Sequence, residues 1–393
     1  MGIAQRWHIL AALTFARTSM GFQFQSIAPL APFVSSGLGL DNTQLGWLIG
    51  IYLLPGVVIA LPGGLLGARY GDKRVTLIGL ALMTGGGIWL ASAETVAEAD
   101  AARLASGVGG VILNVLLTKM VADWFEGKQR LLAMSVLINA WPIGIGLALF
   151  ALPLMGEAIG WRGALAAAAA LTAAGFAAVL FVYRAPAGAA QAAPAGMGLG
   201  VIDTREWRLL AIASIPWFTY NAAYQLVVSF LPSFLLETGS SLTSSGAMTG
   251  LNTAIMIASV QAGGVLLKRS SRPDLLCHAA IISWCASLLL LSSASLPLFW
   301  IVAGGIVAGI PAAAFVNLPA EFLRPESRGV GMGVFYTVYY VGCALVPGIA
   351  GFMSDLAGST GATLWLAALL AFICVPVLIA FRCALRHPQT ARA

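Results

Sequence analysis

One arginine, Arg17, lies inside the first long apolar stretch of the chain, which runs from Trp7 to Val34. At a rise of ~1.5 Å per helical residue it lies ~15 Å along that stretch, near the middle of a ~30 Å hydrocarbon core. A guanidinium keeps its proton, and holding it at that depth costs at least ~2.5–3.5 kcal/mol. Because no carboxylate of the sequence is placed to neutralise it, the sequence predicts that Arg17 binds a small anionic solute.

Aromatic and amide side chains of other apolar stretches could complete such a site. Trp217 corresponds to Arg17 at the offset of 200 residues that relates the two halves of the chain, and aromatic and amide residues continue from it at helical spacing. Ring edges and amide N–H groups carry partial positive charge and suit an anion without burying a second cation. The alternative is that the rings pack helices and the amides hydrogen-bond between them. The expected binding residues are Arg17, Trp217, Tyr220, Asn221, Tyr224, Asn114, Asn139, Tyr336 and Tyr339, with Tyr340 next to the last of these.

The composition indicates a protein that lies within a lipid bilayer. Hydrophobic residues make up 59% of the 393 residues and charged residues only 9%, against ~25% charged in a soluble domain. Apolar runs of membrane-spanning length recur along the whole chain. We therefore expect an all-α membrane protein with twelve transmembrane helices, at about 8–34, 44–66, 75–92, 100–122, 131–154, 163–183, 207–236, 243–267, 275–293, 297–320, 328–353 and 361–382.

Charge placement orients these helices. Most of the 21 Lys and Arg residues fall in loops on the side of the N-terminus, and only Arg103 and Arg162 lie toward the other side. This asymmetry predicts that both termini are cytoplasmic, in a bacterial inner membrane. It also explains the net charge of +6 without nucleic acid. The first apolar stretch is too long for a signal peptide and has no small-residue cleavage site before its polar end.

Several function classes are excluded by residues that the sequence lacks. The five cysteines form no CxxC pair, so we expect no metal site and no redox site. No GxxxxGK[ST] motif is present, which argues against ATP-driven pumping. We expect neither a cofactor nor an enzymatic activity. No Asp, Glu or His occupies the middle of a span, which argues against cationic substrates and leaves exchange, facilitated flux and proton coupling without a buried acid as alternatives.

The chain repeats itself at about half its length. The segment 63–69 (GGLLGAR) ends the second span, and the segment 263–269 (GGVLLKR) ends the eighth. Because six spans separate the repeats, the two halves have the same orientation. We expect an N-terminal six-helix bundle at 1–183, a cytoplasmic linker at 184–206 and a C-terminal six-helix bundle with a short cytoplasmic tail at 207–393.

These features resemble the major facilitator superfamily over the full length of the chain. The loop 64–74 (GLLGARYGDKR) is similar to that family's signature loop. The resemblance implies two six-helix bundles that rock about a central cavity. The arrangement of an arginine in the first span upstream of Pro29 and Pro32 distantly resembles that in cyanate and nitrate-type or small organic anion porters. Further matches are Arg103 with Gly107 and Gly109, the loop 123–130, and 160–162 (GWR).

The resemblance also indicates residues that could gate the inner mouth. The acidic position of the signature loop holds Ala68, so the inner latch of the family is weakened and the inward-facing state favoured unless Asp72 replaces it. Acidic and basic residues seven apart follow spans 4 and 10 and look like matched gate pairs, and Lys119 could pair with the acidic residue of the first. The expected gate residues are Arg69, Asp72, Asp123, Arg130, Glu321 and Arg328.

The sequence therefore predicts a monomeric secondary transporter of a small, singly charged anion. Nitrate, nitrite, cyanate and small monocarboxylates are the candidates, because one central cation suits one negative charge. Protons are a candidate coupling ion. Two alternatives are efflux of a neutral or weakly acidic organic molecule, with Arg17 structural, and a non-transporting receptor built on the same fold.

Overall fold

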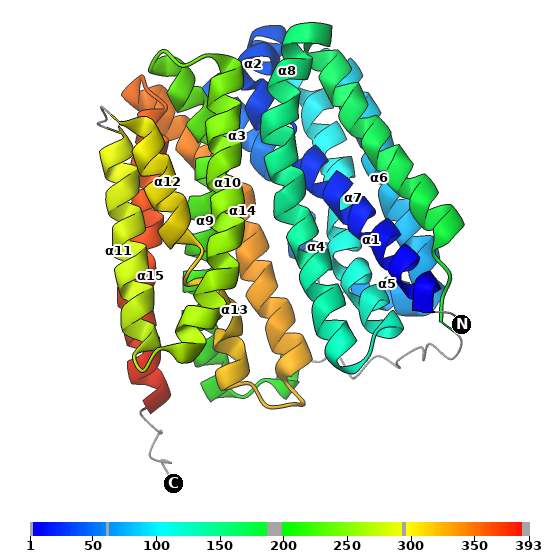
Figure 1. The fold of residues 1–393 in the computed structure, drawn as a ribbon, viewed down its shortest axis with the longest axis vertical. Helices are drawn as coiled ribbons and strands as arrows, with labels where there is room; N and C mark the ends of the chain where they lie inside the picture. Colours follow the sequence, from blue (N-terminus) through cyan, green and yellow to red (C-terminus); the bar gives the residue numbers. More distant parts are fainter. Residues whose placement is uncertain (1–2, 60–62, 187–198, 293–295, 387–393) are drawn as a thin grey trace.

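The protein is almost entirely helical in a computed structural model that describes residues 3–59, 63–186, 199–292 and 296–386 (Figure 1). No strand occurs within those ranges. The first half contains α1 (Ile3–Phe24), η1 (Ala28–Leu30), α2 (Ala31–Leu38), α3 (Asn42–Gly50), η2 (Ile51–Leu53), α4 (Gly56–Ile59), α5 (Gly63–Tyr70), α6 (Asp72–Ser92), α7 (Val96–Trp124) and α8 (Gly127–Val182). The second half contains η3 (Leu199–Val201), α9 (Thr204–Glu237), α10 (Leu242–Arg269), α11 (Pro273–Ser292), α12 (Pro297–Ala308), α13 (Ala312–Asn317), η4 (Leu318–Glu321), α14 (Arg328–Ala357) and α15 (Gly361–Arg386).

These elements reproduce the twelve predicted spans, with breaks that the apolar runs did not reveal. Span 1 bends between α1 and η1 just before Pro29, and span 10 bends between α12 and α13 at Pro311. A proline supplies no backbone N–H to a helix, so it favours such breaks. Spans 5 and 6 form one helical run, α8, which turns at Gly160 with a φ of 74°. A left-handed φ of this kind is readily adopted only by glycine.

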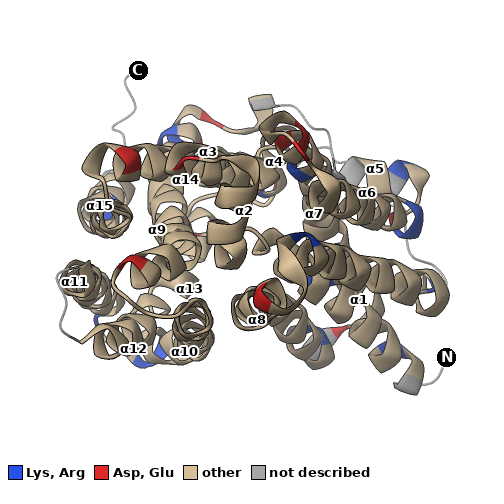
Figure 2. Cartoon of the chain, turned by 90° about the horizontal axis from the view of Figure 1, so that it is seen from above, with Lys and Arg blue, Asp and Glu red and all other residues tan. Residues whose placement is uncertain are grey.

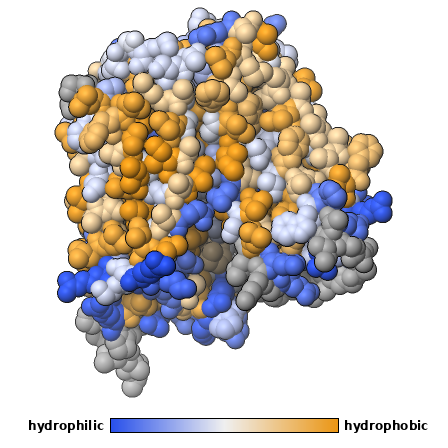
Figure 3. Space-filling view, in the orientation of Figure 1, coloured by the Kyte–Doolittle hydropathy of each residue, from blue (hydrophilic) through white to orange (hydrophobic). Residues whose placement is uncertain are grey.

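The surface matches a bilayer-spanning protein. Nine helical segments of the described residues are long and apolar enough to cross a membrane, and one of them, 132–182, contains two spans. The α1–α2 and α9 runs complete the set of twelve. Large apolar side chains such as Phe150 and Trp365 are more than half exposed. Figure 3 shows hydrophobic residues over the middle and upper part of one face and hydrophilic residues gathered at its lower end.

The start of α1 and the end of α15 both lie toward the lower end of the molecule in Figure 1, which we call the inner end; the opposite end is the outer end. Seen from above, α1 and α5 to α8 lie on one side and α9 to α13 and α15 on the other, while α3 lies beside α14 where the two groups meet (Figure 2). The linker predicted at 184–206 falls largely on 187–198, which lie outside the described residues.

The two halves pack tightly at the outer end through glycines of α3 and α10. A Cβ at Gly46 of α3 would lie 2.0 Å from the carbonyl oxygen of Pro347 in α14. A Cβ at Gly246 of α10 would lie 2.3 Å from the carbonyl oxygen of Leu149 in α8. Gly46 and Gly246 are separated by the 200-residue offset of the repeat. The outer closure is therefore built twice, once on each side of the interface.

Contact between the halves is looser toward the inner end. The polar bridge there, from Gln261 Nε2 to Asn139 Oδ1, is long at 3.4 Å. Figure 3 shows the surface hollowed between the halves above the inner end. The described residues therefore adopt a conformation that is closed outside and open inside.

A buried carboxylate fixes the inner end of the second half. Glu206 is only 3% exposed and accepts hydrogen bonds from Arg324 N, Nε and Nη2 at 2.9, 3.2 and 3.1 Å. Ser327 Oγ donates a fourth, at 2.6 Å. Burial by itself raises the pKa of Glu206, but the hydrogen bonds from Arg324 and Ser327 outweigh it and lower the pKa to about 2. Glu206 therefore ties the start of α9 to the loop before α14.

We expect Glu206→Gln to destabilise the protein by about 1.5–3 kcal/mol at neutral pH, because it removes a charged acceptor of several hydrogen bonds. The folded-state pKa lies below the unfolded value of ~4.3, so this stabilisation is complete above that value and is lost as pH falls toward about 2. Melting temperatures in detergent at about pH 7 and about pH 3 should show the gap between parent and variant narrowing in acid. An equal gap at both pH values would contradict the assignment.

Candidate solute-binding site and gates

The predicted counter-charge lies between the two halves. Arg17 of α1 is 9% exposed, and its Nη2 donates a hydrogen bond to Asn114 Oδ1 of α7 at 2.8 Å. Asn114 Nδ2 in turn donates to the Tyr340 hydroxyl of α14 at 3.0 Å. Nε and Nη1 of Arg17 are buried and have no hydrogen-bond partner within the described residues. No described carboxylate forms an ion pair with Arg17.

Aromatic residues of the second half lie near this arginine. Tyr336, Tyr339 and Tyr340 of α14 all lie close enough to Arg17 to interact with its charge. The ring of Tyr339 lies 6.2 Å from that of Trp217 in α9, centroid to centroid. The structure thus brings together Arg17, Asn114, Trp217, Tyr336 and Tyr339 of the predicted set and adds Tyr340, one helical turn beyond Tyr336. We call these six residues the central cluster.

Four predicted binding residues make other contacts. Tyr220 is 2% exposed and donates to the Ala308 carbonyl at 3.0 Å inside the second half. Asn221 Nδ2 donates to the Trp217 carbonyl of its own helix at 2.7 Å. The Tyr224 hydroxyl lies 3.5 Å from Thr253 Oγ1, and Asn139 forms the long bridge described above. Within the described residues, none of these four side chains makes a hydrogen bond to Arg17.

Arg103 is held by backbone rather than by a carboxylate. It is fully buried, and its Nε, Nη1 and Nη2 donate to the carbonyls of Leu48, Gln23 and Phe24 at 3.1, 3.1 and 3.0 Å. Its guanidinium carbon also lies 4.7 Å from the centre of the Tyr52 ring. Arg103 therefore anchors α7 against the ends of α1 and α3, where helix breaks leave carbonyl oxygens free.

Each predicted acidic gate residue pairs within its own half in this conformation. Lys119 binds Asp72 and lies 3.5 Å from Asp123. Glu321 binds Arg382, which also holds Asp274 at 2.9 Å. The side chains of Arg69, Arg130 and Arg328 are exposed, and Arg69 lies over the Tyr70 ring. Among the described residues no ion pair crosses the inner mouth, consistent with its being open.

A carboxylate not predicted as a gate residue connects the halves at the outer end. Asp355, near the end of α14, accepts hydrogen bonds from the backbone N–H groups of Asn42 and Thr43 at 3.1 and 2.8 Å, and from Thr43 Oγ1 at 2.5 Å. These N–H groups begin α3, where the positive end of the helix dipole favours an anion. The contact spans more than three hundred residues, so no local sequence pattern could have revealed it. We call it the outer latch.

We expect Asp355→Asn to shift the protein toward the outward-open state. The amide keeps one acceptor but loses the charge that interacts with the α3 dipole, worth about 1 kcal/mol, or roughly fivefold in the conformational equilibrium. The reporter is a cysteine that replaces Gln25, whose side chain donates to the Val228 carbonyl of the second half. Its reaction with an impermeant maleimide added from outside should increase accordingly. Glu157→Gln is the matched control, because Glu157 contacts Thr243 only at 3.4–3.5 Å. Equal accessibility in both variants would show that Asp355 is no latch.

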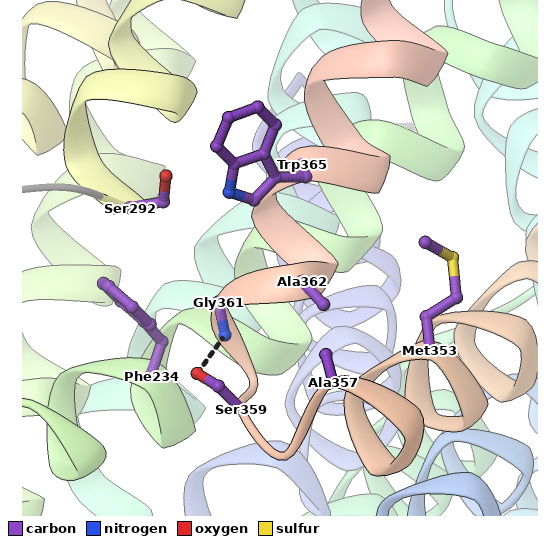
Figure 4. A pocket seen from close by; sticks show the side chains of 8 residues that line it. All are labelled: Phe234, Ser292, Met353, Ala357, Ser359, Gly361, Ala362 and Trp365. Carbon is purple, nitrogen blue, oxygen red and sulfur yellow. Dashed lines mark hydrogen bonds between the residues drawn. The ribbon is translucent and has the colours of Figure 1, made fainter.

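A cavity of about 360 Å³ lies at the outer end of the second half, away from the central cluster (Figure 4). Its mostly apolar lining includes Phe234, Met353 and Trp365, and the polar side chain of Ser359 also lines it. The Ser359 hydroxyl instead accepts a hydrogen bond from the Gly361 N–H at 3.1 Å, as Figure 4 shows. With no charged residue in its lining, this cavity does not suit an anion.

The comparisons with known proteins agree with this architecture. A sequence model described as the Major Facilitator Superfamily matches residues 13–303. The chain belongs to the major facilitator superfamily. It is a multi-pass membrane transporter of that superfamily and not an enzyme, in agreement with the prediction.

Three of the curated relatives are named for organic or inorganic anions, while another is named for methyl viologen resistance. A 3-(3-hydroxy-phenyl)propionate transporter of Escherichia coli (strain K12) is 28% identical over 362 residues, covering 86% of this chain and 85% of the relative. A hexuronate transporter of Bacillus subtilis (strain 168) is 23% identical over 64% of this chain and 63% of its own length. A nitrite extrusion protein of the same organism is 22% identical over 40% of each chain.

Solved structures of transporters share the fold. A bacterial homologue of the human lysosomal transporter Spinster, in an inward-facing and unoccupied conformation, matches all of this chain with a TM-score of 0.80 at 16% identity. A D-xylose–proton symporter matches 95% of this chain and 97% of its own, with a TM-score of 0.80 at 14% identity. At these identities the likeness shows the fold, and the substrate must be argued from this chain's own residues.

Proposed function

We propose that this transporter moves a small, singly charged anion across the bacterial inner membrane by alternating access. The candidates are nitrate, nitrite, cyanate and small monocarboxylates. The observation that carries the proposal is Arg17, a cation that is 9% exposed and has two donor nitrogens without partners. A buried donor without a partner costs about 1–3 kcal/mol, more when charged, and a bound anion would offset that cost.

The cluster around Arg17 supports a single negative charge. Asn114 and the tyrosine hydroxyls are neutral, so one anionic group satisfies the site and a second would lack a counter-charge. The relatives named for hexuronate, nitrite and an aryl propionate all carry anions at neutral pH, which favours an anion here.

The orientation and the coupling belong to the same proposal. We place both termini in the cytoplasm, because Lys and Arg gather in the loops of the inner end. The cavity then opens to the cytoplasm in this conformation. We propose a monomer that exchanges anions or couples to protons without a carboxylate in the middle of a span.

Flux in reconstituted liposomes tests the function. We expect saturable uptake of at least one labelled anion among nitrate, cyanate and short monocarboxylates. An imposed pH gradient should drive uptake if protons are coupled, and an unlabelled anion inside should accelerate it if the protein exchanges anions. Uptake of a neutral analogue with no uptake of any anion would overturn the proposal in favour of efflux of a neutral molecule.

A further inference from the structure

The side of the central cluster contributed by the second half is built from aromatic rings. Trp217 stacks on Phe335, with ring centroids 6.1 Å apart and planes 17° from parallel. Trp217 and Tyr339 lie 6.2 Å apart at 34°, and Tyr339 meets Tyr336 and Tyr340 nearly edge-on, at 6.3 and 5.0 Å. The rings thus form a continuous series from the indole of α9 to the tyrosines near Arg17.

The central cluster contains two kinds of hydrogen-bond donor, one from each half of the chain. They are Nε and Nη1 of the Arg17 guanidinium and the indole Nε1 of Trp217. All three nitrogens are buried and have no partner within the described residues. Buried donors of this kind are rare in native proteins, and each requires an explanation. Arg17 belongs to α1 and Trp217 to α9, so a solute that satisfied both would connect the two halves of the transporter.

Among the candidate anions, the small inorganic ones would use only part of this arrangement. Nitrate or cyanate at Arg17 would satisfy the guanidinium but leave the Trp217 N–H unpaired and the ring series without an apolar partner. A planar ring would instead pack against Tyr339 and Trp217 in the offset or edge-to-face geometries that aromatic groups prefer.

Resting on the function proposed above, we propose that the transported anion is an aromatic monocarboxylate whose ring carries a hydrogen-bond acceptor. Its carboxylate binds Arg17, its ring packs against Tyr339 and Trp217, and the acceptor takes the Trp217 Nε1 hydrogen. Trp217 is then a specificity-determining residue. A solute that reaches both halves also favours their closure around it, because its contacts are complete only when α1 and α9 approach each other.

The test compares probes that differ in one feature. Binding of benzoate, para-methoxybenzoate, para-methylbenzoate, cyclohexanecarboxylate and nitrate is measured by calorimetry on the purified transporter and on Trp217→Phe. We expect the benzoates to bind the parent at least about tenfold more tightly than nitrate or cyclohexanecarboxylate. The methoxy compound should bind about fivefold more tightly than the methyl compound, the ratio for one hydrogen bond of about 1 kcal/mol.

Trp217→Phe keeps a ring but removes the N–H, so the ratio between methoxy and methyl compounds should fall to about one while benzoate still binds. Trp141→Phe is the matched control, because Trp141 packs against Phe24 in the first half, 5.0 Å between rings, and should leave the ratio unchanged. An unchanged ratio in Trp217→Phe, or nitrate binding the parent as tightly as the benzoates, would overturn the inference.

The same experiment separates this inference from the proposed function. If Arg17→Ala abolishes binding of every anion but the aromatic acids bind the parent no better than nitrate, the anion function stands and the aromatic class is wrong. If no anion binds the parent, or Arg17→Ala binds all of them unchanged, the proposed function itself fails and the aromatic class with it.

Discussion

The double variant Gly46→Trp with Gly246→Trp is expected to lose transport completely while it keeps its binding site. In the conformation described here a Cβ at either position would lie 2.0–2.3 Å from a backbone carbonyl oxygen of the opposite half. Even one extra methylene in a packed interior costs about 1–3 kcal/mol, and an indole against rigid backbone costs far more. The outer end therefore cannot close, and the protein is held outward-open.

Two measurements check this expectation. Uptake into liposomes should fall to background, whereas anion affinity, measured on detergent-solubilised protein, should stay within a few fold. Gln25 is 2% exposed and donates to the Val228 carbonyl of the second half. A reporter cysteine in its place should become reactive toward an impermeant maleimide added from outside. The five native cysteines are removed first.

The matched control introduces two tryptophans at glycines that do not pack against the rest of the protein. Gly85 of α6 and Gly264 of α10 have no atom within 4 Å of an added Cβ. Gly85→Trp with Gly264→Trp should therefore cycle like the parent. If the Gly46 and Gly246 variant also transports normally, the outer closure seen here is not part of the transport cycle.

Most of the architecture could be predicted from the sequence because membrane spans depend on local composition. Length and hydropathy determine a span without reference to distant residues, so the twelve spans and the repeat could be predicted from the sequence. The helix breaks near Pro29 and Pro311 could not be predicted in the same way, because a proline can either interrupt a helix or begin one.

The candidate site was predictable in part, for a different reason. Arg17 stands out because its cost in lipid is high wherever its partners lie. Tyr220 was grouped with it by helical spacing, but its hydroxyl binds the carbonyl of Ala308, the last residue of α12. That carbonyl is free because the helix ends there, and only the three-dimensional fold brings it to Tyr220. The outer latch at Asp355 likewise depends on a helix end more than three hundred residues away.

Arg17→Ala is expected to lower anion affinity by at least about a hundredfold. Loss of one member of a buried charged pair costs about 3–5 kcal/mol, because the other member is left without a partner in a low-dielectric environment. Arg17→Lys keeps the charge but loses the planar fork that grips two oxygens at once, so its affinity should be intermediate. The Ala variant should still fold and insert, since it removes a buried cation that no carboxylate neutralises.

Asn114→Asp provides the complementary test, because it supplies that carboxylate from within the protein. Asn114 Oδ1 already accepts from Arg17 Nη2 at 2.8 Å, and aspartate has nearly the same shape. A permanent ion pair would compete with the solute, so this variant should also lose anion affinity while its melting temperature rises. Affinity and melting temperature of all four proteins decide the matter. If Arg17→Ala binds the anion as tightly as the parent, or fails to fold, Arg17 is structural; if Asn114→Asp binds normally, the anion lies elsewhere.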